Sequence, residues 1–377
     1  MPRAPRFLLK ISITGLLVLT AVGAAAWIER GRLLSWYYVR QLQKASGESI
    51  EESLRHVNAL GAAAVPRLLD CLRGSSEAGC ANATAALDRL VRRGLEADDA
   101  SLALLPEQIA DAFPGFSASG RKCALGLAAT WLMDGSQPPQ PRLRSAVTAI
   151  LEHCAAMKDS ESRLTSLRLV PTLMKLGQGH PSTATCRGLV AASLGDDNET
   201  VRLAALHLAL DQSIGLKTQA LALLKDPSAR IRRETLAALG PMTDLLATDD
   251  LLAWLYDPDR DVQAICELAL RARGLGDTQL RLGRMKASPD PRVRLGLFAK
   301  LPNAPELDQG VWLRSLSHDA SPAVRAAALR SAVEQDAFDL TDRLEQMREN
   351  DPSATVRQLA QYYLSCQKYR SRAESGN

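Results

Sequence analysis

One turn-and-helix phrase recurs six times in the second half of the chain, and this repetition constrains the fold more than any other feature. The phrase reads DPSARIRRETLAALG from Asp226 and DPSATVRQLAQYYL from Asp351. Successive copies lie 30 to 32 residues apart. A period of that length predicts an array of small supersecondary units rather than one compact core. Aligned on the apolar residue that usually precedes an arginine, the copies are anchored at Val201, Ile231, Val262, Val293, Val324 and Val356.

Each copy has the pattern of a helix–turn–helix unit. Asp and Ser at the start of the phrase can supply N-cap oxygens, and Pro at the first helical position costs no hydrogen bond. An apolar stripe with helical spacing follows, as at Ile231, Leu236 and Leu239. A shorter apolar stripe precedes the phrase, as in TQALALLK from Thr218. Neither helix can bury its stripe alone, so successive units are expected to stack.

The composition agrees with an all-helical chain. Aromatic residues make up only 4% of the 377 residues, whereas hydrophobic residues make up 46%. Apolar and polar residues seldom alternate with period two, so strands are poorly supported. We therefore predict an all-α fold, an α-solenoid of about nine helix pairs. Its regular repeats are expected over residues 196–367, its degenerate repeats over 46–195, and a polar tail over 368–377.

The Asp-Pro turn, the Val-Arg pair and the second helix rich in small residues resemble the HEAT repeat. The likeness is to the short form of about 31 residues, described as HEAT-like or phycobilisome-lyase-type. It covers Asp196–Gln367, and Leu60–Gly74 with Cys80–Gly94 looks like a further unit. The resemblance implies an armadillo-type superhelix whose concave face binds a protein or peptide. We predict a monomeric scaffold that has no catalysis of its own.

Between these blocks the spacing becomes irregular. Helix pairs are predicted at Ser101–Phe113 with Ser117–Leu132, and at Arg142–Ala156 with Ser160–Leu176. The run GSQPPQP at Gly135–Pro141 interrupts them, because its prolines are incompatible with a helix. We interpret the region as degenerate repeats with longer loops. A domain boundary at this run is the alternative.

The N-terminus carries a second strong signal. Residues 1–10 form a basic flank, and residues 11–28, ISITGLLVLTAVGAAAWI, contain no charge. As a helix this run would be about 27 Å long, close to the thickness of a bilayer core. We predict a single transmembrane anchor, and the chain also resembles single-pass bacterial HEAT-repeat proteins. The small residues at 22–26 leave a cleaved signal peptide as the alternative.

Residues 29–45 predict an amphipathic juxtamembrane helix. Trp27 lies at the end of the apolar run and Trp36 just beyond it, where interfacial aromatic residues gather. The helix could lie at the membrane, cap the first repeat, or do both. Near one side of it the sequence places Leu33, Leu34, Tyr37, Tyr38 and Leu42.

The sequence indicates less clearly on which side of the membrane the helical repeats lie. Basic residues flank the apolar run at both ends, so the positive-inside comparison is nearly even. A short basic N-terminus usually stays inside, which would place the solenoid on the exported, periplasmic side. After signal cleavage it would be periplasmic or secreted.

A search for catalytic or metal-binding patterns returns none. No histidine is followed by glutamate, so the His-Glu pairs of HEAT-like di-iron hydroxylases are missing. There is no Cys-x-x-Cys, no His-x-x-x-His and no Gly-rich phosphate loop. We predict no catalytic residue, metal or cofactor. The histidines of the chain are His56, His153, His180, His207 and His318, and its cysteines are Cys71, Cys80, Cys123, Cys154, Cys186, Cys266 and Cys366.

The cysteines are odd in number and lie mostly in apolar stripes, which is typical of small core residues rather than of a disulfide framework. The net charge of +4 is mild for a nucleic-acid-binding protein. The favoured function is a membrane-tethered scaffold for a protein or peptide. The alternatives are a lyase-type HEAT-like enzyme and a nucleic-acid-binding HEAT protein.

One column of residues remains a candidate site. An arginine follows the anchor in five copies, and Gln263 takes its place in the sixth. Stacked units would align these arginines into an anion-binding column for an acidic partner. Alternatively they pair with acids of the neighbouring turns, which is the interpretation we favour. The arginines are Arg202, Arg232, Arg294, Arg325 and Arg357, and the acids are Asp197, Asp226, Asp257, Asp319 and Asp351.

Overall fold

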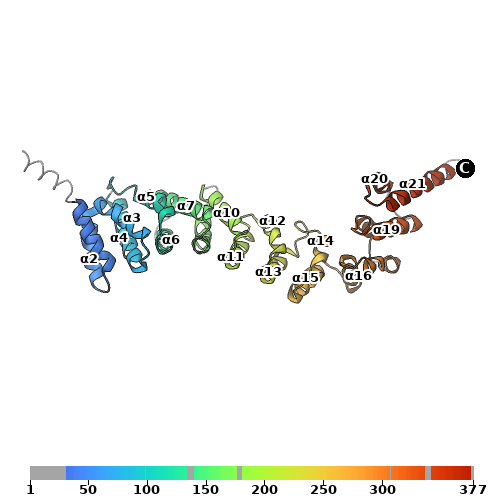
Figure 1. The fold of residues 1–377 in the computed structure, drawn as a ribbon, viewed down its shortest axis with the longest axis horizontal. Helices are drawn as coiled ribbons and strands as arrows, with labels where there is room; N and C mark the ends of the chain where they lie inside the picture. The colour runs from blue at the N-terminus through green and yellow to red at the C-terminus, as the bar shows by residue number, and fades with distance from the viewer. Residues whose placement is uncertain are drawn as a thin grey trace, which may run out of the picture. The chain divides into compact units, whose positions relative to one another are not determined.

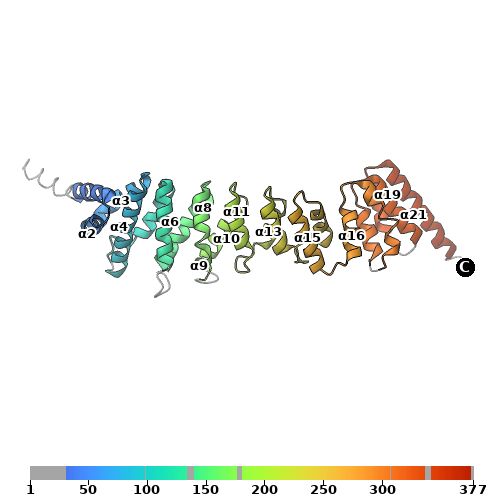
Figure 2. The same cartoon turned by 90° about the horizontal axis from the view of Figure 1, so that it is seen from below.

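The computed structural model describes residues 31–97, 99–133, 140–175, 181–305, 307–335 and 341–374. Over these ranges it contains α- and 3-10 helices and no strand, which confirms the all-α prediction (Figures 1 and 2). No helix of this described part is both long and apolar enough to cross a membrane. The predicted anchor at residues 11–28 lies outside it. The chain divides into two compact units, Met1–Gln219 and Ala220–Asn377.

In the first unit, the helices contact one another in two rows. Helices α2, α4, α6, α8 and α11 each contact the next in one row, and α5, α7 and α10 do so in the other. Figure 2 shows α4, α6, α8 and α11 in succession. After a helix at 31–44, the elements are α2 (Ser49–Leu60), η1 (Gly61–Ala64), α3 (Val65–Arg73), α4 (Glu77–Glu96), α5 (Leu105–Ala112), η2 (Phe113–Gly115), α6 (Ala118–Met133), α7 (Pro141–Ala156), α8 (Ser160–Leu167), α9 (Val170–Lys175), α10 (Pro181–Ser193) and α11 (Glu199–Ala209).

The single helix predicted over Ser160–Leu176 was wrong. It is two helices, because α8 ends at Leu167 and α9 begins at Val170. Pro171 explains the break, since a proline ring clashes with the carbonyl four residues earlier and has no N–H to donate. The apolar spacing alone did not show this interruption.

In the second unit, a first helix and a second helix alternate along the chain. Many buried side chains of its described residues gather in clusters that follow one another along the chain, over residues 224–280, 282–332 and 329–364. Each cluster is built from consecutive helices, so the core runs along the unit instead of filling one centre. The first helices are α12 (Lys217–Ala220) with η3 (Leu221–Lys225), α14 (Thr248–Leu252) with η4 (Ala253–Tyr256), α16 (Asp277–Ala287), α18 (Gln309–Leu316) and α20 (Thr341–Asn350). The second helices are α13 (Ala229–Leu239), α15 (Arg260–Ala272), α17 (Pro291–Leu295), α19 (Pro322–Gln335) and α21 (Ala354–Glu374).

Five of the six anchor residues are fully buried, and Val293 is the exception. Val293 is 38% exposed, whereas Val262 and Val324 are 0% exposed. Helix α17, which carries Val293, ends after only five residues. Leu297 and Leu301, which follow it, are buried in the same cluster as Val324. Val293 is therefore not part of the buried stripe that its anchor position predicts.

Candidate functional site: the turn arginines

The turn arginines, Arg202, Arg232, Arg294, Arg325 and Arg357, begin with the same local contact. Each lies in the first turn of a second helix, and its Nη1 donates back to a carbonyl of the preceding turn. Nη1 of Arg232 donates to the carbonyl oxygens of Asp226 and Pro227 at 2.8 and 3.1 Å. Nη1 of Arg357 donates to the carbonyl of Asp351 at 2.6 Å. These bonds hold the guanidinium against its own turn.

From there, three turn arginines reach forward to the next turn of the second unit. Nε and Nη2 of Arg232 donate to the two carboxylate oxygens of Asp257, both at 2.8 Å. The planar guanidinium matches a carboxylate at two points, which makes this geometry both specific and strong. The same two-point pairs join Arg294 to Asp319 at 2.7 and 2.9 Å, and Arg325 to Asp351 at 2.8 and 2.7 Å.

The acids of these pairs also order their own turns. Oδ1 of Asp257 accepts the backbone N–H of Asp259 at 2.8 Å, and Oδ1 of Asp351 accepts that of Ser353 at 2.8 Å. The predicted N-cap at α15 comes from an Asp of the phrase, but from Asp259 and not from the leading Asp257. The cap of α15 is Asp259, whose side chain accepts from the amides of residues 261 and 262. The leading acid instead links one turn to the next.

Burial makes these pairs different from ordinary surface ion pairs. The side chains of Arg325 and Asp351 are 8% and 3% exposed. Burial raises the pKa of Asp351, but hydrogen bonds from Arg325 and from the Ser353 amide outweigh it and hold that pKa below its ordinary value. The hydrogen bond to Asp351 raises the pKa of Arg325. Both partners therefore stay charged, and each neutralises the charge of the other.

Two further pairs in the first unit were missed by the sequence analysis. Arg121 pairs with Asp159 at 2.8 Å, and Arg163 pairs with Asp196 at 2.7 Å. Gly120 and Ser162 precede these arginines where the repeat has Val or Ile, so the alignment did not find them. The spacing between each arginine and its own preceding turn could have revealed these pairs. Nη2 of Arg163 donates to the carbonyl of Met157, six residues back, at 2.6 Å.

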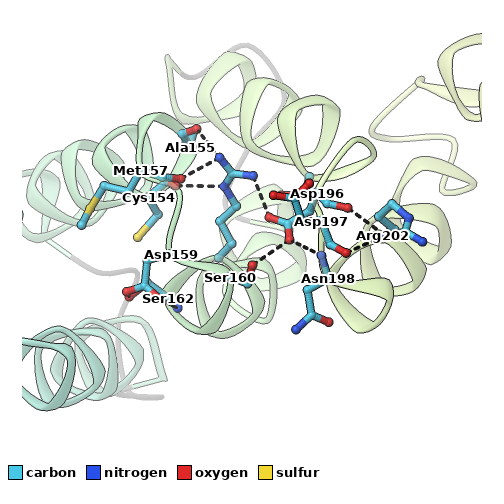
Figure 3. A network of polar contacts seen from close by, with 12 residues as sticks. Cys154, Ala155, Met157, Asp159, Ser160, Ser162, Asp196, Asp197, Asn198 and Arg202 are labelled. Atoms are coloured by element: carbon cyan, nitrogen blue, oxygen red, sulfur yellow. Dashed lines mark hydrogen bonds and ion pairs between the residues drawn. The ribbon is translucent and has the colours of Figure 1, made fainter.

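Asp196, and not the predicted Asp197, is the linking acid at this turn. Its Oδ1 accepts from Ser160 Oγ at 2.7 Å and from the amide of Asn198 at 2.8 Å (Figure 3). Asp197 contributes its carbonyl, which accepts from Nη1 of Arg202 at 3.0 Å. Asp196 is 5% exposed, whereas Asp197 is exposed. The assignment of Asp197 as the pairing acid was therefore wrong.

The copy that lacks the arginine is followed by the copy that lacks the leading acid. Gln263 keeps the backward contact, because its Nε2 donates to the carbonyl of Asp257 at 2.7 Å. The acid position that follows it, at the 25-residue offset of the Arg232–Asp257 pair, is Ser288. Ser288 Oγ accepts the amide of Asp290 at 3.3 Å and so keeps the turn contact. Losing both charges together avoids leaving one of them buried and unpaired.

This arrangement suits a structural link better than an anion site. In Arg232, Arg294 and Arg325, all three guanidinium nitrogens already donate to turns. A ligand would have to displace a buried carboxylate to reach them. If the turns pair with each other, the loss of both charges at Gln263 and Ser288 is expected. In a ligand-binding column, the same change would leave one position without an arginine.

Other chemistry is sparse in the residues that the structure describes. They contain no group of three or more His, Cys, Asp or Glu placed to hold a metal ion. The seven cysteines are free, and five of them are buried. Burial raises the pKa of Cys154 and of Cys266 to about 12, so these thiols stay protonated at neutral pH.

Comparison with known proteins finds no family model and no curated protein that matches this chain. The likeness to HEAT repeats thus rests on the repeated phrase and its spacing. The linked turns and the two rows of helices are compatible with a helical repeat protein.

Proposed function

We propose that the chain is a HEAT-type α-solenoid that holds a protein or peptide partner and is tethered to a membrane by residues 11–28. The observation that carries this proposal is the set of buried arginine–aspartate pairs between consecutive turns. A stacked array needs a contact that fixes each unit against its neighbour, and these pairs supply it. The recurring arginines and aspartates then hold neighbouring helices together, which leaves the exposed faces of the helices to bind a partner.

The proposed binding surface is the row of second helices, which lines the concave face in a solenoid of this type. Leu268 on α15 and Tyr362 on α21 are 60% and 62% exposed. Large side chains kept on a solvent-facing helix supply the apolar contacts that a protein partner buries. We assign these two positions to partner contact and expect the chain itself to be a monomer.

Site-specific crosslinking in intact membranes tests this assignment. A photoreactive amino acid at Leu268 is compared with one at Val311 on the first helix α18, and both positions are 60% exposed. We expect one defined protein to be captured from Leu268 and not from Val311, and its binding to be reproduced with purified components. Equal capture from both positions, or none, would contradict the proposal. Retention on DNA or heparin at moderate salt would favour nucleic-acid binding instead.

Fractionation tests the tether separately. The full chain should sediment with membranes and resist extraction by high salt and by carbonate, because an apolar span is held by the hydrocarbon core. An external protease should reach the helical units if they lie on the exported side. A mature N-terminus at Ala25, Ala26 or Trp27 would show a cleaved signal peptide and would overturn the anchor.

A further inference from the structure

The helix at residues 31–44 is locked onto the first unit by one of its faces. Ser35, Val39 and Leu42 on this face are 2%, 4% and 1% exposed. Asn82 Nδ2 on α4 donates to the carbonyls of Leu42 and Ala45 at 2.8 and 3.1 Å, which holds the C-terminal end of the helix. The orientation of the helix is therefore fixed by the fold of the unit.

The opposite face carries large apolar residues outward. Leu33, Trp36 and Tyr37 are 65%, 47% and 51% exposed. The sequence analysis placed Leu42 on the same side as Leu33 and Tyr37, which was wrong, because Leu42 faces the protein. Aromatic rings with a polar edge prefer the headgroup level of a bilayer.

The same outward face is basic. At helical spacing, Arg40 and Lys44 follow Leu33 by seven and eleven positions and lie on its side of the helix. The guanidinium of Arg40 lies over the ring of Trp36, 5.2 Å from its centroid. Residues 31–44 contain no Asp or Glu. The charge of this face is complementary to an anionic membrane surface.

A hollow of about 270 Å³ lies beside Trp36, between this helix and α3. Arg40 and Arg67 line it, and Asp70, the acid among its described lining residues, already accepts from Arg73 at 2.7 Å. Neither Arg40 nor Arg67 has an acidic partner among the described residues. Two guanidinium groups around a small hollow suit a phosphate group.

The position of this helix in the chain identifies the occupant. The uncharged run of residues 11–28 ends five residues before Leu33. In the proposed tether, a helix that begins three residues after the span starts at the membrane surface. Charge, aromatic content and chain position thus agree on a lipid bilayer.

We propose that the outward face of helix 31–44 lies in the headgroup layer of an anionic bilayer, with a lipid phosphate held between Arg40 and Arg67. The inference deepens the proposed tether and rests on it. Because Asn82 fixes this helix to α4, the contact orients the first helix pairs on the membrane.

Tryptophan quenching by brominated phosphatidylcholine tests the contact in the full chain. The protein is reconstituted into vesicles with and without phosphatidylglycerol, and Trp36→Phe is compared with Trp27→Phe. We expect each variant to lose part of the quenching. The part lost in Trp36→Phe should be larger in vesicles with phosphatidylglycerol than in vesicles without it. Loss with Trp27→Phe alone would overturn the headgroup contact and leave the tether standing. Loss with neither variant would overturn both.

The phosphate site is tested with Arg40→Gln/Arg67→Gln in the same vesicles. The phosphatidylglycerol-dependent gain in Trp36 quenching should fall to the level seen with phosphatidylcholine alone. Arg230→Gln, at an exposed arginine of the second unit, should leave the gain unchanged. An unchanged gain in the double variant would overturn the site. Loss of the gain with excess free glycerol phosphate in the wild type would also overturn it, by showing a soluble phosphate as the ligand.

Discussion

Arg325 and Asp351 lie in consecutive turns of the second unit and meet at two points, with Nε and Nη2 of the arginine 2.8 and 2.7 Å from the carboxylate oxygens. Nη1 of the same arginine donates to the carbonyl of Asp319 in its own turn at 2.8 Å. One side chain therefore links two turns that are far apart in the sequence. Arg232 and Arg294 make the same kind of link. Neighbouring helix pairs are therefore held together by specific ion pairs as well as by apolar contacts.

Arg232→Met should destabilise the second unit much more than Arg233→Met. Arg232 is 14% exposed and pairs with the buried Asp257, whereas Arg233 is 41% exposed and pairs with the exposed Asp261. Removing one partner of a buried pair costs about 3–5 kcal/mol, because the other charge stays buried without compensation. An exposed pair is worth about 0–1 kcal/mol. Urea unfolding and hydrogen exchange of α13 and α15 measure both costs.

A double-mutant cycle identifies the source of that cost. Asp257→Asn in the Arg232→Met background should add little, because the charge left unpaired is then removed. Additive costs of the two changes would mean that the pair does not act as a unit.

The missing link of the second unit should be restorable. Gln263→Arg together with Ser288→Asp recreates the residues of the Arg232–Asp257 pair at the same 25-residue offset. Each single change introduces an unpaired charge into a site that is 5% exposed at Ser288, and should destabilise. The double variant should be more stable than the sum of the single effects by about 1–3 kcal/mol. Urea midpoints of the four proteins give this coupling, and a value near zero would show that the two turns are not aligned for pairing.

The two anchors Val324 and Val293 should respond differently to the same substitution. Val324→Asp places a carboxylate at a 0% exposed position in an apolar cluster and should cost several kcal/mol, roughly 3–5. Val293→Asp places it at a 38% exposed position and should cost about 1 kcal/mol or less. Thermal unfolding followed by circular dichroism compares them. Similar losses would indicate that α17 packs against its neighbours more tightly than the structure shows.

The buried pairs should make stability depend on acid pH. The pKa values of Asp196, Asp257 and Asp351 are held below their ordinary value because hydrogen bonds to arginine and to backbone amides outweigh burial. A lowered folded pKa contributes stability above the unfolded pKa of about 3.9, and this contribution is lost as the pH falls through the folded value. The arginines stay protonated throughout this range. Unfolding free energy should be flat near neutral pH and fall steeply below about pH 4.

Asp257→Asn provides the control for this pH dependence. The variant should be less stable than the wild type at neutral pH, and the gap should narrow as the pH falls, because the wild type loses the same interaction by protonation. Urea midpoints measured from neutral to acid pH test this. A gap that stays constant would show that the Asp257 carboxylate does not supply the stability.

The sequence alone determined what depends on local pattern. Helical spacing of apolar residues, the Asp-Pro turns and the period of the phrase predicted an all-α chain, and Val201, Ile231, Val262, Val324 and Val356 are fully buried as their spacing predicts. The offset between turn acids and turn arginines also suggested that neighbouring turns pair. These features are readable because each depends on residues a few positions apart, or on the regular recurrence of one unit.

Only the tertiary structure decided which of two plausible residues forms a link between turns. Asp196 and Asp197 are adjacent and chemically identical, and the backbone direction at the turn puts the first beside Arg163. The pairs of Arg121 and Arg163 join residues 38 and 33 positions apart, where irregular loops hide the offset. A Cβ at Gly120 would lie 1.9 Å from the carbonyl oxygen of Leu72, so the close approach of α6 to α3 sets this residue. Contacts between distant segments depend on the positions of whole helices, which local propensity and spacing do not specify.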